Sequence, residues 1–267
     1  MAQNGTHDDI VIASYPDLRD KIVFLTGIGQ SGDQEMWGNG AATTRLLAKQ
    51  GAKIFGCDLY LEPAQHTQMR IVAEGGDVTV VAADVTNDES VKSAVDANVG
   101  RSEPGGPAEM TEKVWDAQTN VNLKSVYLCC HHILPLMEKQ CSGAVVNVAS
   151  IAGLRYIGKP QVAYAATKAA VIQFTKATAV IYASKNIRMN VVVPGLMNTS
   201  LVGMLADKYA GGDVEGFKAK RNKAVPMGRM GDSFDVAMTA LFLASSQSRY
   251  ITGQKIVVDG GITSSTG

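Results

Sequence analysis

Short apolar runs alternate with helix-period stretches along nearly the whole chain, and this alternation strongly limits the possible folds. The runs are rich in β-branched residues and lie at 21–25, 53–57, 78–81, 144–148, 189–193 and 255–258. They are almost continuously hydrophobic, which is typical of strands buried on both faces of a parallel sheet. The main helix-period stretches lie at 41–49, 109–139, 163–184 and 234–244. The pattern predicts an α/β fold with a doubly wound, mostly parallel sheet between two helix layers.

Composition narrows the class of protein further. The chain has 267 residues, of which 46% are hydrophobic, and this is enough apolar material for one domain with a sizeable core. The 25 basic and 25 acidic residues give a formal net charge of +0, without the basic excess typical of nucleic-acid binding. Residues 1–16 are polar and lack the pattern of a secretion signal. We therefore expect one domain over residues 17–267, preceded by a polar extension.

The sequence carries no sign of a membrane span, a metal site or a disulfide framework. Its purely apolar runs are far shorter than the ~20 residues that cross a bilayer. The four cysteines match neither a zinc-ligand spacing nor a disulfide pattern. These features predict a cytoplasmic protein without a bound metal, with neither nucleic acid nor a membrane as a partner.

The residues that follow the first two strands point to a dinucleotide. Parallel sheets bind ligands beyond the carboxyl ends of their strands. Gly27, Gly38 and Gly40 lie between the first strand and the first helix, where glycine lets the backbone approach a pyrophosphate. The second strand ends at Asp58, whose carboxylate can bind a ribose diol and would repel a 2′-phosphate. Taken singly, these residues could be a plain turn and a surface cap, but together they favour dinucleotide binding.

A second group of reactive side chains lies in the middle of the chain. Tyr164 and Lys168 are four residues apart and share one face of a predicted helix. A nearby ammonium stabilises phenolate and lowers a tyrosine pKa from its usual ~10, which makes Tyr164 a usable acid or base. Ser150 follows the strand at 144–148, where its hydroxyl could either bind a substrate carbonyl or cap a turn.

From Asp17 to Gly260 the chain carries the motifs of one enzyme family, in that family's order. They are Thr26-Gly27 with Gly38-x-Gly40, Asp84-Val85, Asn98-Val99-Gly100, Asn122-Leu123, Asn147-Val148-Ala149-Ser150, Tyr164-x-x-x-Lys168, Pro194-Gly195, and Thr252-Gly253 with Asp259-Gly260-Gly261. The chain thus resembles the short-chain dehydrogenase/reductase family. The resemblance implies a Rossmann-type fold and hydride transfer between a nicotinamide cofactor and a small alcohol or ketone.

The resemblance also implies roles for individual residues. Tyr164 would exchange a proton with the substrate oxygen, and Lys168 would lower the pKa of Tyr164 and hold the nicotinamide ribose. Ser150 would orient the carbonyl, and Asn122 would hold a water that relays protons from Lys168. The cofactor would be NAD rather than NADP, bound by Gly27, Ile28, Gly38, Gly40, Asp58, Asp84, Val85, Asn98, Tyr164, Lys168 and Thr199.

The sequence says less about the substrate and the oligomeric state than about the cofactor. The segment 196–229 is apolar and is expected to be a mobile lid, and Tyr156, Gln161 and Met197 are candidate substrate contacts. The helices at 109–139 and 163–184 carry more apolar residues than one sheet face can cover. Because related enzymes pair these helices across a two-fold axis, we expect a homotetramer or a homodimer.

The phosphate turn is longer than the family pattern. Ten residues separate Gly27 from Gly38, where the family has three. Residues 30–37 could form a flap over the cofactor or bulge into solvent, since long surface loops cost little. A longer loop also occurs in the enoyl-thioester reductase branch, but that branch spaces its tyrosine and lysine seven apart, unlike Tyr164 and Lys168.

A second departure concerns the centre of the sheet. Only thirteen residues lie between Asp84 and Asn98, where the family has a helix and then a strand. A crossover alone needs ~10–12 residues. Residues 94–99 could serve as the missing strand, or the sheet could have a gap, and the valines at 91, 95 and 99 fit either a strand or a helix. A catalytically impaired relative that still binds a dinucleotide is therefore the alternative function.

Overall fold

Six of the strands form two parallel, three-stranded sheets in a computed structural model that describes residues 11–30, 32–33, 35–94 and 102–266. In the first sheet the order is β1 (Ile22–Thr26), β2 (Lys53–Asp58), β3 (Asp77–Ala82). In the second sheet the order is β4 (Gly143–Val148), β5 (Ile187–Pro194), β8 (Lys255–Val258). All six predicted strands are present, and the α/β Rossmann-type prediction is confirmed.

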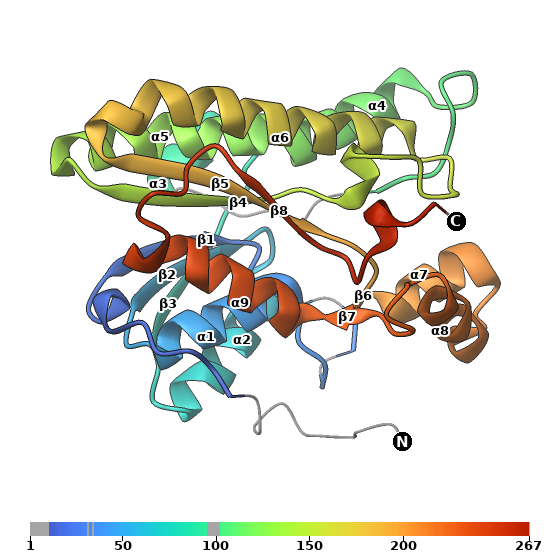
Figure 1. The fold of residues 1–267 in the computed structure, drawn as a ribbon, viewed down its shortest axis with the longest axis horizontal. Helices are drawn as coiled ribbons and strands as arrows, with labels where there is room; N and C mark the ends of the chain where they lie inside the picture. The colour runs from blue at the N-terminus through green and yellow to red at the C-terminus, as the bar shows by residue number, and fades with distance from the viewer. Residues whose placement is uncertain (1–10, 31, 34, 95–101, 267) are drawn as a thin grey trace.

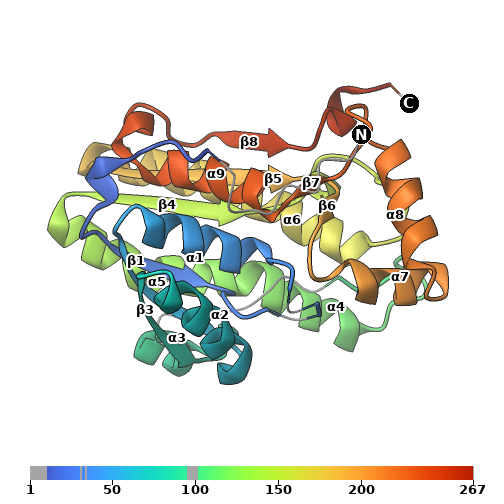
Figure 2. The ribbon, with the colours of Figure 1, turned by 90° about the horizontal axis from the view of Figure 1, so that it is seen from below.

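Helices cover the strands on both sides, as Figures 1 and 2 show. One layer contains α1 (Asn39–Lys49), α2 (Leu61–Ala73) and α9 (Ser233–Ala244). The other contains α4 (Glu112–Thr119), α5 (Ser125–Gln140) and α6 (Val162–Tyr182). The prediction missed α2, and it joined α4 and α5 into one helix. A π-helical turn at Asn120–Lys124 lies between α4 and α5, and Thr111 caps the start of α4.

The contact between α1 and α9 joins the two halves of the molecule. Leu46 and Leu47 of α1 pack in one buried cluster with Phe234 and Leu241 of α9. The same α9 packs against β4, β5 and β8, whereas α1 packs against β1 and β2. The end of the N-terminal extension joins this cluster through Tyr15, whose N–H donates to the Gln50 side chain at 2.7 Å.

The centre of the molecule shows the effect of the short crossover. Within the described ranges, β1 and β4 are not hydrogen bonded to each other and no strand lies between them. Every residue of β1 and β4 is at least partly exposed, and Val148 is 41% exposed, whereas Val191, Val192 and Val193 of β5 are buried. Residues 95–99 of the predicted strand 94–99 lie outside the described residues, and Ala94 is the last residue of the helix α3 (Asp88–Ala94).

The predicted lid segment forms a pair of helices. Within 196–229, β6 (Met197–Asn198) leads into α7 (Val202–Ala210) and α8 (Val214–Lys223), and β6 pairs with β7 (Gly231–Asp232). Figures 1 and 2 place α7 and α8 beyond the carboxyl ends of β5 and β8. Among the described residues, no helix combines the length and the apolar character that a membrane span requires.

Candidate active site

Two hydroxyl groups meet at the carboxyl end of β4. Ser150 follows β4 in extended backbone and caps the short turn Ile151–Gly153, accepting from the Ala152 N–H at 3.2 Å. Tyr164 lies in the first turn of α6, and its hydroxyl faces the Ser150 side chain. Ser150 therefore caps a turn, as one of its two predicted roles requires, and the other role, binding a substrate carbonyl, stays a prediction.

Lys168 lies one helical turn after Tyr164, as the spacing predicts. Its Nζ is 5.7 Å from the centre of the Tyr164 ring and donates to the Val148 carbonyl oxygen at 3.0 Å. The residue is 8% exposed, and burial lowers the pKa of Lys168 from 10.5 to about 8. An amine with such a pKa can exchange protons near neutral pH.

The pKa of Tyr164 differs from the expectation. Burial raises it above its usual value of 10.0, and the hydrogen bond with Ser150 offsets this rise only in part. Lys168 is not among the groups that lower it, and the Lys168 ammonium donates instead to the Val148 carbonyl oxygen. A neutral Tyr164 is a hydrogen-bond donor, which suits the role of a proton donor to a carbonyl oxygen.

Asn122 contacts α6 from the segment that joins α4 to α5. It lies in the π-helical turn, and its Nδ2 donates to Thr167 Oγ1 at 3.2 Å. Thr167 in turn donates to the Tyr164 carbonyl oxygen at 2.9 Å. π-Helical turns occur often at functional sites because they redirect single side chains. Sequence reasoning missed Thr167, which has no motif of its own.

The phosphate turn is built by close backbone contacts. The N–H groups of Gly27 and Ile28 both donate to the Cys57 carbonyl oxygen, at 3.0 and 3.3 Å. A Cβ on Gly40 would lie 1.9 Å from the Gly27 carbonyl oxygen, so only glycine allows α1 to begin this close to β1. Gly38 is the N-cap of α1. Ile28 is fully buried.

The carboxylate of Asp58 faces this turn. Its Oδ2 accepts from the Gly29 N–H at 2.9 Å, and the residue is 7% exposed. Burial raises the pKa of Asp58, while hydrogen bonds from neighbouring backbone N–H groups act in the opposite direction. A Cβ on Gly29 would be 2.7 Å from the carboxyl group. The predicted ribose-binding group and the phosphate turn are thus in direct contact.

The other predicted cofactor residues have less uniform surroundings. Asp84 accepts from the backbone N–H and the hydroxyl of Thr86, at 2.9 and 2.7 Å, so its carboxylate shapes the turn before α3. Val85 is 1% exposed and Thr199 is 8% exposed. Asn98 lies outside the described residues.

The inserted loop is held in place by its own side chains. Gln30 is 2% exposed, and its amide donates to the carbonyl oxygens of Asp33 and Met36 and accepts from the Gly38 N–H. Trp37 is buried beneath Arg70, whose Cζ is 3.6 Å from the centre of the ring.

The same loop contacts the lid segment. The Asp33 N–H donates to the Ser200 carbonyl oxygen at 3.3 Å. A cavity of about 260 Å³ lies between the loop, Thr199 and the helices α7 and α8. The insert thus spans from the phosphate turn to Ser200, the residue after Thr199.

Two side-chain amides, each with a buried oxygen, flank this region. Asn39 Oδ1, at the start of α1, and Asn198 Oδ1, just before Thr199, have no hydrogen-bond partner among the described residues. Buried polar atoms are normally paired, and an amide can present either end to a ligand. With the close Gly27–Gly40 contact and the Asp58 carboxylate, they fit a nicotinamide dinucleotide.

The three candidate substrate residues lie in different surroundings. Gln161 donates to the hydroxyl of Tyr209 in α7 at 2.9 Å, so it connects the start of α6 to the lid segment. Tyr156 is 72% exposed. Met197 is 7% exposed and packs in the core with Val192 and Val236.

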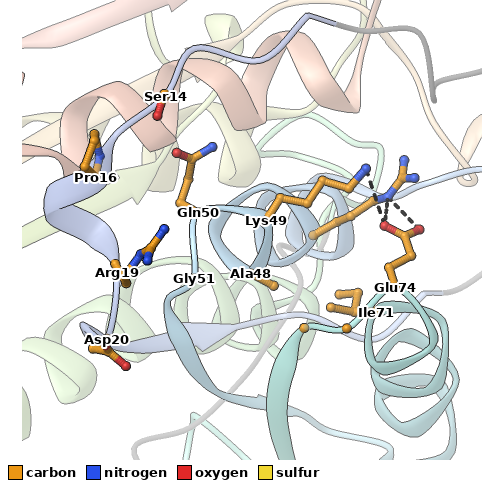
Figure 3. Close-up of a pocket in the computed structure, with 13 residues that line it drawn as sticks. Ser14, Pro16, Arg19, Asp20, Ala48, Lys49, Gln50, Gly51, Ile71 and Glu74 are labelled. Atoms are coloured by element: carbon orange, nitrogen blue, oxygen red, sulfur yellow. Dashed lines mark hydrogen bonds and ion pairs between the residues drawn. The ribbon is translucent and has the colours of Figure 1, made fainter.

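A separate cavity lies at the opposite edge of the molecule, near the amino ends of β1 and β2. Its volume is about 540 Å³, and Arg19, Gln50 and Gly51 are part of its lining. Figure 3 shows Glu74 facing Lys49, with an ion pair at 3.5 Å; Arg45 also binds this carboxylate, at 2.9 Å. The Glu74 carboxylate is thus shared by two cations, and the cavity is far from the carboxyl ends of the strands.

Comparisons with known proteins place the chain in a family. A family model described as enoyl-(acyl carrier protein) reductase matches residues 34–263. A 3-oxoacyl-[acyl-carrier-protein] reductase from Thermotoga maritima is 34% identical over 258 residues, covering 92% of this chain and 98% of the relative. The chain belongs to the short-chain dehydrogenase/reductase family.

Other members of the family agree in fold and length. A cyclohexanol dehydrogenase from Acinetobacter sp. is 34% identical, covering 92% of this chain and 96% of that protein. The crystal structure of a short-chain dehydrogenase/reductase from Burkholderia xenovorans has a TM-score of 0.87 and 40% identity, covering 95% of this chain and 100% of the other. The protein is accordingly an enzyme, an NAD(P)-dependent oxidoreductase of CH–OH and C=O groups.

Proposed function

We propose that this enzyme transfers hydride between NAD(H) and the carbinol or carbonyl carbon of a small secondary alcohol or ketone. The observation that carries the proposal is that the Ser150 and Tyr164 hydroxyls face each other beside the buried Lys168. Two hydroxyls that touch each other can both reach a third oxygen placed between them. The four-residue spacing of Tyr164 and Lys168 favours a carbonyl or alcohol substrate over an enoyl thioester.

The residues of the chain divide the work of reduction as follows. Ser150 donates a hydrogen bond to the substrate carbonyl and orients it. Tyr164 gives its hydroxyl proton to the substrate oxygen as the C–O double bond becomes a single bond, and in oxidation it takes the proton back. Lys168, with its lowered pKa, supplies the replacement proton to Tyr164. Asn122 steadies the first turns of α6 through Thr167. The nicotinamide, when bound, supplies the hydride or accepts it.

The cofactor preference follows from Asp58. Its carboxylate lies beside the phosphate turn, where it can accept hydrogen bonds from the adenosine ribose hydroxyls. A 2′-phosphate at that position would meet a buried negative charge. We therefore place NAD(H) ahead of NADP(H).

The test of the proposal is Tyr164→Phe, which keeps the ring and removes the proton-exchanging oxygen. We expect kcat for secondary alcohols to fall by ~10²–10⁴-fold. Cofactor affinity, measured by fluorescence titration, should change little, because most predicted cofactor contacts lie elsewhere. The matched control is Tyr182→Phe at the far end of the same helix, which should keep normal kcat.

The separated sheets favour one alternative, an impaired relative that binds the cofactor without turning over. A wild-type protein that binds NAD(H) but oxidises none of a panel of secondary alcohols would support that alternative. A normal kcat in Tyr164→Phe would instead show that another group exchanges the proton.

A further inference from the structure

Two cations lie on aromatic rings where the active-site loop meets the lid segment. Lys159 Nζ is 4.1 Å from the centre of the Tyr209 ring and 5.0 Å from that of Phe217. Arg221 of α8 lies on the same Phe217 ring, with its Cζ at 5.1 Å. Both cations are half-buried, and Phe217 is 6% exposed.

Neither cation has an acidic partner among the residues that the structure describes. Their neighbours on α7 and α8 do, since Lys208 pairs with Glu103 at 2.7 Å and Lys218 pairs with Glu215 at 3.0 Å. The Arg221 Nε donates only to the Met230 sulfur, at 3.2 Å.

The electrostatic surroundings of these two cations are unfavourable. Burial lowers the pKa of Lys159, and the positive charges of Arg221 and Lys220 lower it further. Burial also lowers the pKa of Arg221. Like charges held together in a half-buried place raise the free energy of the site unless an anion joins them.

The cluster lies next to the reacting groups along the chain. Lys159 is in the loop that joins Ser150 to Tyr164, the two residues proposed to hold the carbonyl. Gln161, two residues later, donates to the hydroxyl of Tyr209, the ring under Lys159. The loop that leads into Tyr164 is therefore in direct contact with α7 of the lid segment.

We propose that Lys159 and Arg221 bind an anionic group of the substrate, so that the preferred substrates are small hydroxy or oxo compounds with a carboxylate or a phosphate. The proposal rests on the proposed function, since it names the substrate class of the same site. Arg presents a planar fork of donors that matches either anion, and Lys adds a point charge.

The experiment compares a carboxylate substrate with its uncharged ester and adds a phosphate substrate. Oxidation of 3-hydroxybutanoate is measured beside its neutral methyl ester, and glycerol 3-phosphate serves as the phosphate arm. We expect the wild type to show a KM for one of the anions at least ~10-fold below that of the ester, which corresponds to ~1.4 kcal/mol. The anion that is favoured identifies carboxylate or phosphate as the group bound.

Variants then assign the effect to the two cations. Lys159→Met and Arg221→Met should each raise KM for the favoured anion about tenfold and leave KM for the ester unchanged. The control Lys223→Met removes an exposed cation from the same helix and should change neither. If the cations only fasten the lid segment through the aromatic rings, the variants will affect anion and ester alike, and that result overturns the proposal.

A binding measurement separates this proposal from the proposed reaction. Butanoate and butanamide cannot be oxidised at a carbinol carbon, so their binding is measured by calorimetry whether or not the protein turns over. We expect butanoate to bind more tightly than butanamide, and Lys159→Met to remove the difference. Equal binding of the two by the wild type would overturn the anion site, even in a protein that oxidises neutral alcohols.

Discussion

At the scale of single residues, Lys168 serves the proposed reaction but lowers the folding stability of the protein. Its pKa is lowered to about 8 because the folded protein disfavours the buried ammonium. At pH 7 the lysine is protonated in both the folded and the unfolded state, so folding has to bury its charge. Lys168→Met is therefore expected to raise the free energy of unfolding at pH 7 by about 1 kcal/mol, after the lost hydrogen bond to Val148 is counted, while activity and cofactor affinity fall.

The pH dependence of unfolding checks the cause. Between pH 8 and 10.5 the unfolded lysine holds a proton that the folded one has lost, so wild-type stability gains a contribution as pH rises. Denaturant titrations at several pH values should show that gain in the wild type and in Lys176→Met, an exposed position of the same helix. A gain that persists in Lys168→Met would contradict this account.

Asp58 carries the prediction of cofactor preference. Asp58→Asn keeps an acceptor for the Gly29 N–H but removes the charge. We expect kcat/KM for NADP(H), relative to NAD(H), to increase about tenfold or more, which is ~1.4 kcal/mol. Asp77→Asn, at the exposed amino end of β3, is the control. Higher kcat/KM with NADP(H) in the wild type would show that the carboxylate has been assigned the wrong role.

Residue spacing predicts local pairs well and distant ones poorly. Tyr164 and Lys168 could be placed together because a helix brings residues four apart onto one face. The link from Asn122 to Thr167 and the contact of Lys159 with Tyr209 join segments that only the folded chain brings together. The predicted direction of the Tyr164 pKa shift was wrong for the same reason, because the burial of a side chain depends on the whole fold.

At the scale of elements, the inserted loop provides the next prediction. Gly32 has φ +87°, and a Cβ there would lie 2.1 Å from the Ser200 carbonyl oxygen. Gly32→Ala should therefore push the insert away from the lid segment. We expect the Kd for the cofactor to rise several-fold, measured by fluorescence titration.

Gly75→Ala is the matched control for this variant. Gly75 has nearly the same backbone angle, φ +84°, but no atom within 4 Å of its added Cβ. Both variants incur the backbone strain of about 1 kcal/mol, and only Gly32→Ala disturbs a neighbour. Equal cofactor affinity in the two variants would mean that the insert does not contribute to binding.

The elements show where pattern reasoning succeeds and where it stops. The six strands are predicted because continuous apolar runs are a strong signal of a buried parallel sheet. The break at Asn120–Lys124 carries no proline or glycine, so nothing in the residue pattern interrupts the expected helix. The conformation of the insert depends on Trp37 meeting Arg70 and Phe234, which lie far along the chain.

At the scale of the whole molecule, the outer face of α6 predicts self-association. Val180 and Ile181 are 74% and 64% exposed on that face, and Tyr127 and Leu136 of α5 are 50% and 47% exposed. Two copies that pair these helices would cover the apolar surface on both. Val180→Asp with Ile181→Asp should convert the oligomer to a smaller species in light scattering. Val72→Asp, on the exposed side of α2, should leave the mass unchanged, and a monomeric wild type would refute the prediction.

The separation of the two sheets has a consequence for cooperativity. Backbone hydrogen bonds do not connect β1 to β4 in the described part of the chain, so α1 and α9 carry much of the connection between the halves. Each half can then open as its own folding unit. Asp58 and the phosphate turn belong to one unit, and Ser150 and Tyr164 belong to the other. A bound dinucleotide would reach from one unit to the other, so in this protein the cofactor would also act as a structural tie.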